Sequence, residues 1–296
     1  MAAVTLSLAS LHSSRQIQRP GAGRLLYASA ILLSSALLFL SQPMMAKAML
    51  PWFGGSAGVW TTSMLFFQCV LLAGYLYAHA LTRYLSGRVQ AVVHVALLVA
   101  SVSVLPLHPS AGAALGGVER PVWRILGLLA TSIGLPFFVL STTGPLAQSW
   151  YARRPGSRFP YRLFALSNLA SLAALLAYPL GIERFFSGER QWAGWSVAYL
   201  AFALLMGASA IGSASAERPE EKAPARRPLL WMALAACAST LWLAVANHLS
   251  QEVAAIPFLW VLPLGLYLTS FILCFDREGW YRPRLYRWIL PAAWIA

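Results

Sequence analysis

The chain has 296 residues, of which 59% are hydrophobic and only 10% charged, and its mean hydropathy is +0.64. A soluble domain carries roughly 25% charged residues because its surface must face water, so this composition excludes an ordinary soluble globule and indicates a surface that faces lipid. The net charge of +13 comes from Lys and Arg residues that punctuate the apolar runs instead of gathering on one face. This spacing favours topology signals and lipid headgroups over nucleic acid as the partner.

Residues 1–24 are comparatively polar and basic, and they contain no acidic residue. They lack the compact apolar stretch and small-residue cleavage site that a signal peptide needs. We interpret the segment as a cytoplasmic tail, with a transit peptide as the alternative.

Eight apolar runs follow, each near the length of roughly 20 residues that crosses the hydrocarbon core. They lie at about 25–46, 58–82, 90–107, 122–150, 163–181, 191–214, 228–249 and 254–275. A ninth run begins near Trp288 and stops at Ala296, so we expect the chain to be part of a longer protein. The sequence predicts an all-α, polytopic bundle of about eight spanning helices plus a truncated ninth.

The arrangement of basic residues predicts the orientation and the domains. With the N-terminus inside, the inner segments hold 17 of the 22 Lys and Arg residues and the outer segments hold 5, as the positive-inside rule requires. We therefore expect a multi-pass protein of the bacterial inner membrane with a cytoplasmic N-terminus. A polar linker at 215–227 separates a six-helix membrane region at 25–214 from the last segment, 228–296, which holds two further helices and the start of the ninth.

Charged and polar side chains at the predicted outer helix ends are the first candidates for a binding site. Lys47 ends the first run in SQPMMAK. It either extends its ammonium to the headgroups or faces inward and pairs with a carboxylate of another helix. Two carboxylates lie at a similar depth: Glu183, which follows the fifth run, and Glu252, which follows the seventh.

The stretch ANHLSQE after the seventh run is the densest polar cluster near the membrane. Asn247 and Gln251 are four residues apart, as are His248 and Glu252, so a helix would align each pair. A solvated helix end explains this cluster as well as a pocket or ion pathway that opens to the outer side. Together with Lys47 and Glu183, these side chains are the predicted lining of an outer polar site.

Three further polar residues lie inside apolar runs, where we predict a packing role. Gln68 and His79 are eleven residues apart and therefore on nearly the same face of the second helix. Asn168 lies in the fifth run. Hydrogen bonds between helices are the expected use of such side chains.

The fourth run contains Pro136, Gly144 and Pro145. A proline inside a spanning helix frees a backbone carbonyl and kinks the axis. Broken helices line substrate sites in many transporters, although kinks also occur in ordinary bundles.

Catalytic and metal-binding patterns are nearly absent. The chain has no Walker A loop, HExxH or dinucleotide-binding GxGxxG, and we interpret GGSAG at 54–58 as a flexible loop. Cys69, Cys237 and Cys274 lie in apolar runs without CxxC spacing, so we expect small core thiols and no metal site. The chain is predicted to hold no catalytic residue, cofactor or metal of its own.

Four stretches together resemble a known family. They are QPMMAKAMLPWFGGSAGVWTTSMLFFQCVLLAGYLYAH, GLPFFVLSTTGPLAQSWYA, PYRLFALSNLASLAALLAYPLGIE and NHLSQEVAAIPFLWVLPLGLYLTSFILCF. They are similar to the membrane region of bacterial fused spermidine synthase-like, or fused transporter/spermidine synthase, proteins. The resemblance covers most of residues 30–285 and implies that a soluble aminopropyltransferase-like module with a methyltransferase-like Rossmann fold follows this region.

Three functions are therefore in view. The first is a non-enzymatic, transporter-like membrane domain that binds or moves a small solute or anchors a soluble module. The second is the membrane half of an aminopropyltransferase-like enzyme, with the activity in a C-terminal domain outside this sequence. The third is a structural subunit that assembles with other membrane subunits.

Overall fold

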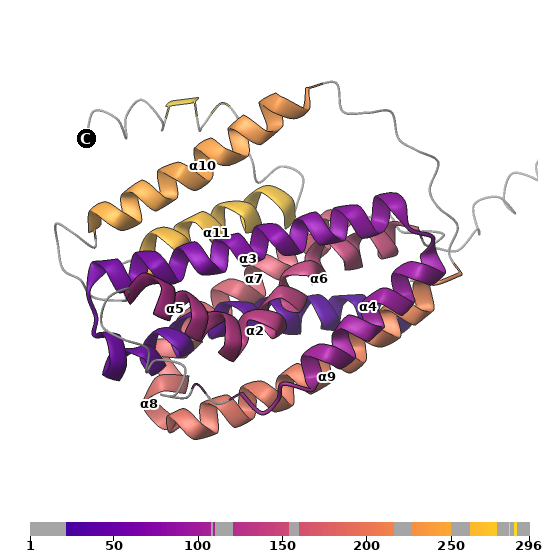
Figure 1. The fold of residues 1–296 in the computed structure, drawn as a ribbon. Coiled ribbons are helices and arrows are strands. Elements are labelled where there is room, and N and C mark those ends of the chain that lie inside the picture. The colour runs from indigo at the N-terminus through magenta and orange to yellow at the C-terminus, as the bar shows by residue number, and fades with distance from the viewer. Residues whose placement is uncertain are drawn as a thin grey trace, which may run out of the picture.

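The structure is a computed structural model and describes residues 22–107, 109, 121–153, 160–215, 227–249, 261–276, 284, 287 and 288. Every regular element in these ranges is helical (Figure 1). The elements are α2 (Ala22–Phe53), α3 (Ala57–Tyr84), α4 (Gly87–Val102), α5 (Pro121–Leu129), the π-helix η2 (Ala130–Gly134), α6 (Leu135–Ala152), α7 (Pro160–Ala177), the π-helix η3 (Tyr178–Ile182), α8 (Glu183–Phe185), α9 (Gly188–Ser213), α10 (Pro228–His248) and α11 (Val261–Asp276).

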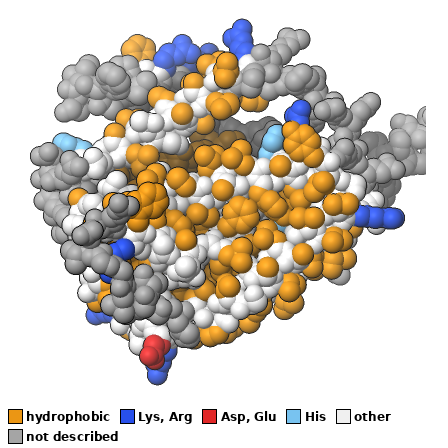
Figure 2. All heavy atoms as spheres, viewed as in Figure 1, with side chains coloured by type: hydrophobic (Ala, Val, Ile, Leu, Met, Phe, Trp, Pro, Cys, Tyr) orange, Lys and Arg blue, Asp and Glu red, His pale blue; other side chains and the backbone are white. Residues whose placement is uncertain are grey.

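The helices have the length and composition that membrane crossing needs, which confirms the predicted fold class. Six stretches in the described residues are long and apolar enough to span a bilayer, and two shorter apolar helices, Gly87–Val102 and Val261–Phe275, complete the set. Apolar side chains cover the visible face of the bundle, whereas Lys and Arg lie mainly near its margins (Figure 2). The chain is a multi-pass helical membrane protein.

Helix α2 is the centre of the bundle, because it packs against α6, α7 and α9. Around this centre, α3 packs on α6, α4 on α9 and α11 on α7, while α10 lies outside and packs mainly against α11. The end of α2, the start of α3 and α8 lie together at one end of the bundle, on the left in Figure 1.

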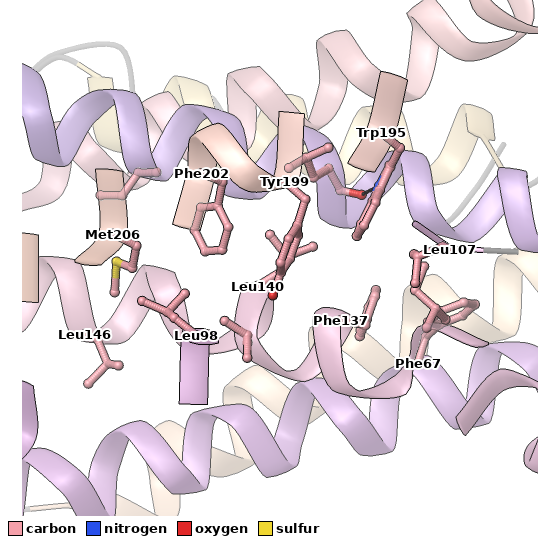
Figure 3. Close-up of a cluster of buried hydrophobic side chains, with 14 of the residues drawn as sticks. Phe67, Leu98, Leu107, Phe137, Leu140, Leu146, Trp195, Tyr199, Phe202 and Met206 are labelled. Carbon is pink, nitrogen blue, oxygen red and sulfur yellow. Dashed lines mark hydrogen bonds between the residues drawn. The ribbon is translucent and has the colours of Figure 1, made fainter. Parts of the chain in front are cut away.

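Aromatic side chains of α9 join α2 and α4 in the core (Figure 3). Trp195 stacks on Tyr199 with ring centroids 5.2 Å apart. The Trp195 indole N–H donates to the carbonyl oxygen of Leu37 over 3.1 Å, and the Tyr199 hydroxyl donates to Ser101 Oγ over 2.6 Å. These bonds satisfy polar groups that would be costly to leave unpaired in an apolar core, so they fix how α9 faces its neighbours.

The third run is shorter as a helix than its apolar length predicted. The run covers 90–107, but α4 ends at Val102. Pro106 follows within a few residues, and a proline disfavours helical backbone in the residue before it. Leu107 is nevertheless buried, and its N–H donates to Ser196 Oγ over 3.4 Å. Leu107 thus packs in the core without being helical, whereas Val104 is exposed.

The expected burial of the cysteines is wrong. Cys69, Cys237 and Cys274 are all exposed on helix surfaces. The outward face of a spanning helix meets lipid, which accepts a thiol as readily as a core does. The position of a cysteine in an apolar run therefore does not predict whether the cysteine faces the protein core or the lipid.

Candidate functional site

An ion pair joins the two candidate residues Lys47 and Glu183. Lys47 Nζ lies 3.1 Å from Glu183 Oε1, and the two side chains are 45% and 33% exposed. Lys47 belongs to α2 and Glu183 begins α8, 136 positions later in the chain. The structure therefore shows Lys47 paired with a carboxylate of another helix, as one of the two predicted arrangements has it, although the Lys47 side chain is exposed and does not face inward.

Lys47 of the pair lies toward the C-terminal end of α2. At about 1.5 Å per residue, Lys47 is about 14 Å along α2 from the middle of that helix. If the helix is centred in the bilayer, this distance is close to half of the roughly 30 Å hydrocarbon core. Charged groups at such a depth are costly unless they are paired or reach water. Lys47 and Glu183 meet this condition because they are paired with each other.

An irregular helical turn positions Glu183. The π-helix η3 lets the Glu183 N–H donate to the carbonyl oxygen of Tyr178, five residues back. The N–H of Phe186 donates to the carbonyl oxygen of Ile182 over 3.1 Å, and the Gln191 side chain donates to the carbonyl oxygen of Phe186 over 2.9 Å. These bonds hold the short segment between α7 and α9 in place, so the carboxylate has a defined position.

The ion pair opens onto a small recess of about 70 Å³. This volume is several times the roughly 10–15 Å³ that a single water molecule needs. Its walls come from α2, α3, α7, η3, α8 and α11, and most of them are apolar. The lining residues are Pro43, Ala46, Lys47, Leu50, Trp60, Leu175, Tyr178, Pro179, Glu183 and Val261.

Tyr178 is a wall residue with an unused polar group. Its side chain is only 3% exposed, and its hydroxyl is buried without a hydrogen-bond partner among the described residues. A buried hydroxyl without a partner costs about 1–3 kcal/mol. The recess is thus lined by a charged pair, the ring of Tyr178 and an indole, Trp60, within an otherwise apolar wall.

The other predicted binding residues are not part of the described recess. Asn247 and His248 are exposed at the C-terminal end of α10. Gln251 and Glu252 lie outside the described residues. A shared site for all six side chains stays a prediction.

The three predicted packing residues differ in their surroundings. Asn168 is buried in α7, where its side-chain amide donates to the carbonyl oxygen of Phe164 over 2.8 Å, within its own helix. Gln68 and His79 are exposed on α3, so the described helices do not bury them. The bond between α2 and α7 comes instead from two serines, Ser35 and Ser167, whose hydroxyl oxygens are 2.7 Å apart.

A second polar cluster, which we call the Gln90–His94 network, was missed by the sequence reasoning. The Trp150 indole N–H donates to Gln90 Oε1 over 3.0 Å, and Gln90 Nε2 donates to the carbonyl oxygen of Leu85 over 2.8 Å. His94 lies edge-on to Trp150 and its Nδ1 is 3.4 Å from the hydroxyl of Tyr77. Gln90, His94 and Trp150 are fully buried.

One sequence signal could have found this network. Gln90 and His94 are four residues apart and so share a face of α4, and Ser101 continues this buried face. A helix with polar side chains on one face and apolar ones elsewhere turns the polar face towards protein when it lies in lipid.

The described part of the chain contains no group of three or more His, Cys, Asp or Glu side chains that could hold a metal ion. Comparisons with known proteins find no family model, no curated protein and no solved structure that matches this chain. The chemistry available to the recess is therefore argued from its own side chains: one donor cation and one acceptor anion that can form reversible polar contacts with a solute.

Proposed function

We propose that the chain is a transporter-like membrane domain that binds a small solute in the recess beside Lys47 and Glu183. The observation that carries this proposal is the ion pair in the wall of the recess. A pair that served only to join α2 to α8 would not need an open recess beside it.

The backbone near the pair supports the same proposal. Irregular helical segments at membrane depth are tolerated where they line cavities, and transporters use them at substrate sites. Single-turn π-helices are also frequent at functional sites. Here η3 contributes Tyr178 and Pro179 to the wall and places Glu183 at its end.

Lys47 and Glu183 both fall within the stretches that resemble the fused spermidine synthase-like family. The proposal treats this chain as the membrane region of such a protein, with the recess as a solute site of that region. A soluble aminopropyltransferase-like module would then supply any enzymatic step.

Solute binding is tested on the purified full chain in detergent with four probes of different charge: glycine, acetate, methylammonium and spermidine. We expect at least one probe to raise the unfolding temperature in a saturable manner, because a ligand that binds only the folded state stabilises it. Lys47→Ala and Glu183→Gln should remove this response. Glu189→Gln, which changes an exposed carboxylate at the start of α9, is the matched control and should keep it.

Uptake of the responding probe into proteoliposomes then separates transport from binding alone. Counterflow that depends on Glu183 supports a transporter. If Glu183→Gln responds to every probe as the unaltered chain does, the recess is not the solute site.

We also propose that the N-terminus is cytoplasmic in a bacterial inner membrane, so that the recess opens on the outer side. Ser56 and Ser86 are exposed at opposite ends of α3, and each can be changed to Cys in a chain whose native cysteines are replaced by Ala. A membrane-impermeant maleimide should label Ser56→Cys in intact cells and Ser86→Cys only after permeabilisation. The reverse pattern would overturn this orientation.

A further inference from the structure

The spacing of the two charges restricts which solutes the recess can attract. Lys47 Nζ and Glu183 Oε1 are only 3.1 Å apart. A single charge that approaches the pair is attracted by one group and repelled by the other at nearly the same distance, so the two Coulomb terms largely cancel. Neither a simple cation nor a simple anion gains much from this pair.

A dipolar solute avoids this cancellation. When it lies antiparallel to the pair, its ammonium faces Glu183 and its carboxylate faces Lys47. The four charges then alternate around a ring, and each has an opposite charge beside it. The solute also adds no net charge to a site whose other walls are mostly apolar, where unbalanced charge is costly.

We infer that the recess binds a small zwitterion whose ammonium contacts Glu183 and whose carboxylate contacts Lys47. This inference rests on the proposed function and names the class of solute. Trp60 supports it, since an indole in the wall favours an ammonium group.

The size of the recess points to a short zwitterion. A volume of about 70 Å³ holds only a few heavy atoms. Glycine and β-alanine meet this limit, whereas a zwitterion with a bulky side chain would have to extend out of the recess. The class is therefore defined by two opposite charges on a short carbon linker.

The test measures saturable binding of radiolabelled glycine to the purified full chain in nanodiscs. Unlabelled β-alanine, acetate, methylammonium and spermidine are the competitors. We expect β-alanine to displace glycine, and we expect the acetate, methylammonium and spermidine curves to show at least tenfold weaker competition. Lys47→Ala and Glu183→Gln should each weaken glycine binding at least tenfold, while Glu189→Gln leaves it unchanged.

A further variant keeps the test independent of folding defects. The charge-exchanged double variant, Lys47→Glu with Glu183→Lys, keeps a pair of opposite charges. It should bind glycine more tightly than either Lys47→Ala or Glu183→Gln, because a zwitterion can reverse its direction.

The outcomes separate this inference from the function on which it rests. If acetate, methylammonium or spermidine binds in a way that depends on Lys47 and Glu183, and glycine does not bind, the inference of a zwitterionic solute is wrong. The proposal of a solute site in the recess then still holds. Failure of all four probes to bind overturns both. Glycine binding that survives Lys47→Ala and Glu183→Gln also overturns the inference, because it places the zwitterion elsewhere.

Discussion

The recess and the Gln90–His94 network show two uses of polar side chains in one apolar bundle. The recess is charged, open to the surface and built beside the π-helix η3. The network contains no ion pair, its residues Gln90, His94 and Trp150 are fully buried, and it is carried by the regular helices α3, α4 and α6. Trp60 at the start of α3 lines the recess, and Tyr77, near the other end of the same helix, reaches the network. The two clusters therefore lie toward opposite ends of the bundle.

This difference separates a structural polar cluster from a binding one. Gln90 uses its oxygen for Trp150 and its amide for the backbone of Leu85, so it has little polar capacity left for a solute. Lys47 and Glu183 each keep part of their surface exposed. Substitution of a network residue should thus lower the free energy of unfolding, whereas substitution of a recess residue should mainly weaken solute binding.

The largest expected effect on stability comes from Trp150→Ala. This change removes a fully buried ring and the donor to Gln90. It should lower the free energy of unfolding by about 3–5 kcal/mol, as other large-to-small aromatic changes do. Titration of the purified chain with SDS, followed by circular dichroism, measures the loss. A change below about 1 kcal/mol would show that the network does not stabilise the bundle.

Gly74→Ala comes next, because Gly74 lets α3 approach α6 closely. A Cβ at this position would overlap Ser141 Oγ and lie 2.9 Å from Ser141 Cβ. Overpacking of this kind costs about 1–3 kcal/mol, measured by the same titration. The double variant Gly74→Ala with Ser141→Gly removes both overlapping atoms. It should recover stability relative to Gly74→Ala, and an absence of recovery would place the strain elsewhere.

Trp150→Phe removes the hydrogen bond of the network and loses less packing than Trp150→Ala. A smaller aromatic ring remains, but Gln90 Oε1 loses its donor. A buried acceptor without a partner should reduce the free energy of unfolding by about 1–2 kcal/mol, again read by SDS titration. The double variant Trp150→Phe with Gln90→Leu removes the acceptor that has no partner. Its free energy of unfolding should fall by less than the sum of the decreases in the two single variants. Strict additivity would contradict a direct interaction between these side chains.

The helices could be predicted from the sequence because length and hydropathy decide which segments cross a bilayer. The first run, expected at 25–46, became α2 at Ala22–Phe53 despite two internal prolines, Pro43 and Pro51. The third run, expected to reach residue 107, is helical only as far as Val102. Such boundaries depend on local backbone hydrogen bonds that hydropathy does not measure.

The side-chain faces could not be predicted in the same way. Gln68 and Gln90 both lie in apolar runs, yet Gln68 is exposed and Gln90 is buried. Lipid and protein core are similarly apolar, so an apolar neighbour does not tell which side of a spanning helix packs. The positions of Lys47 and Glu183 near helix ends were readable from sequence, whereas their contact could not be read from it, because Glu183 directly follows the π-helix η3.

The smallest expected effect on stability concerns the ion pair itself. Lys47 and Glu183 are 45% and 33% exposed, and partly solvated pairs of this kind contribute about 1 kcal/mol or less. A double-mutant cycle with Lys47→Ala and Glu183→Gln, measured by SDS titration without added ligand, should give a coupling free energy in that range. The coupling should shrink at high salt because solvent ions screen exposed charges. A coupling as large as the loss in Trp150→Ala would mean that the pair is a structural clamp, and the contrast between the two clusters would then fail.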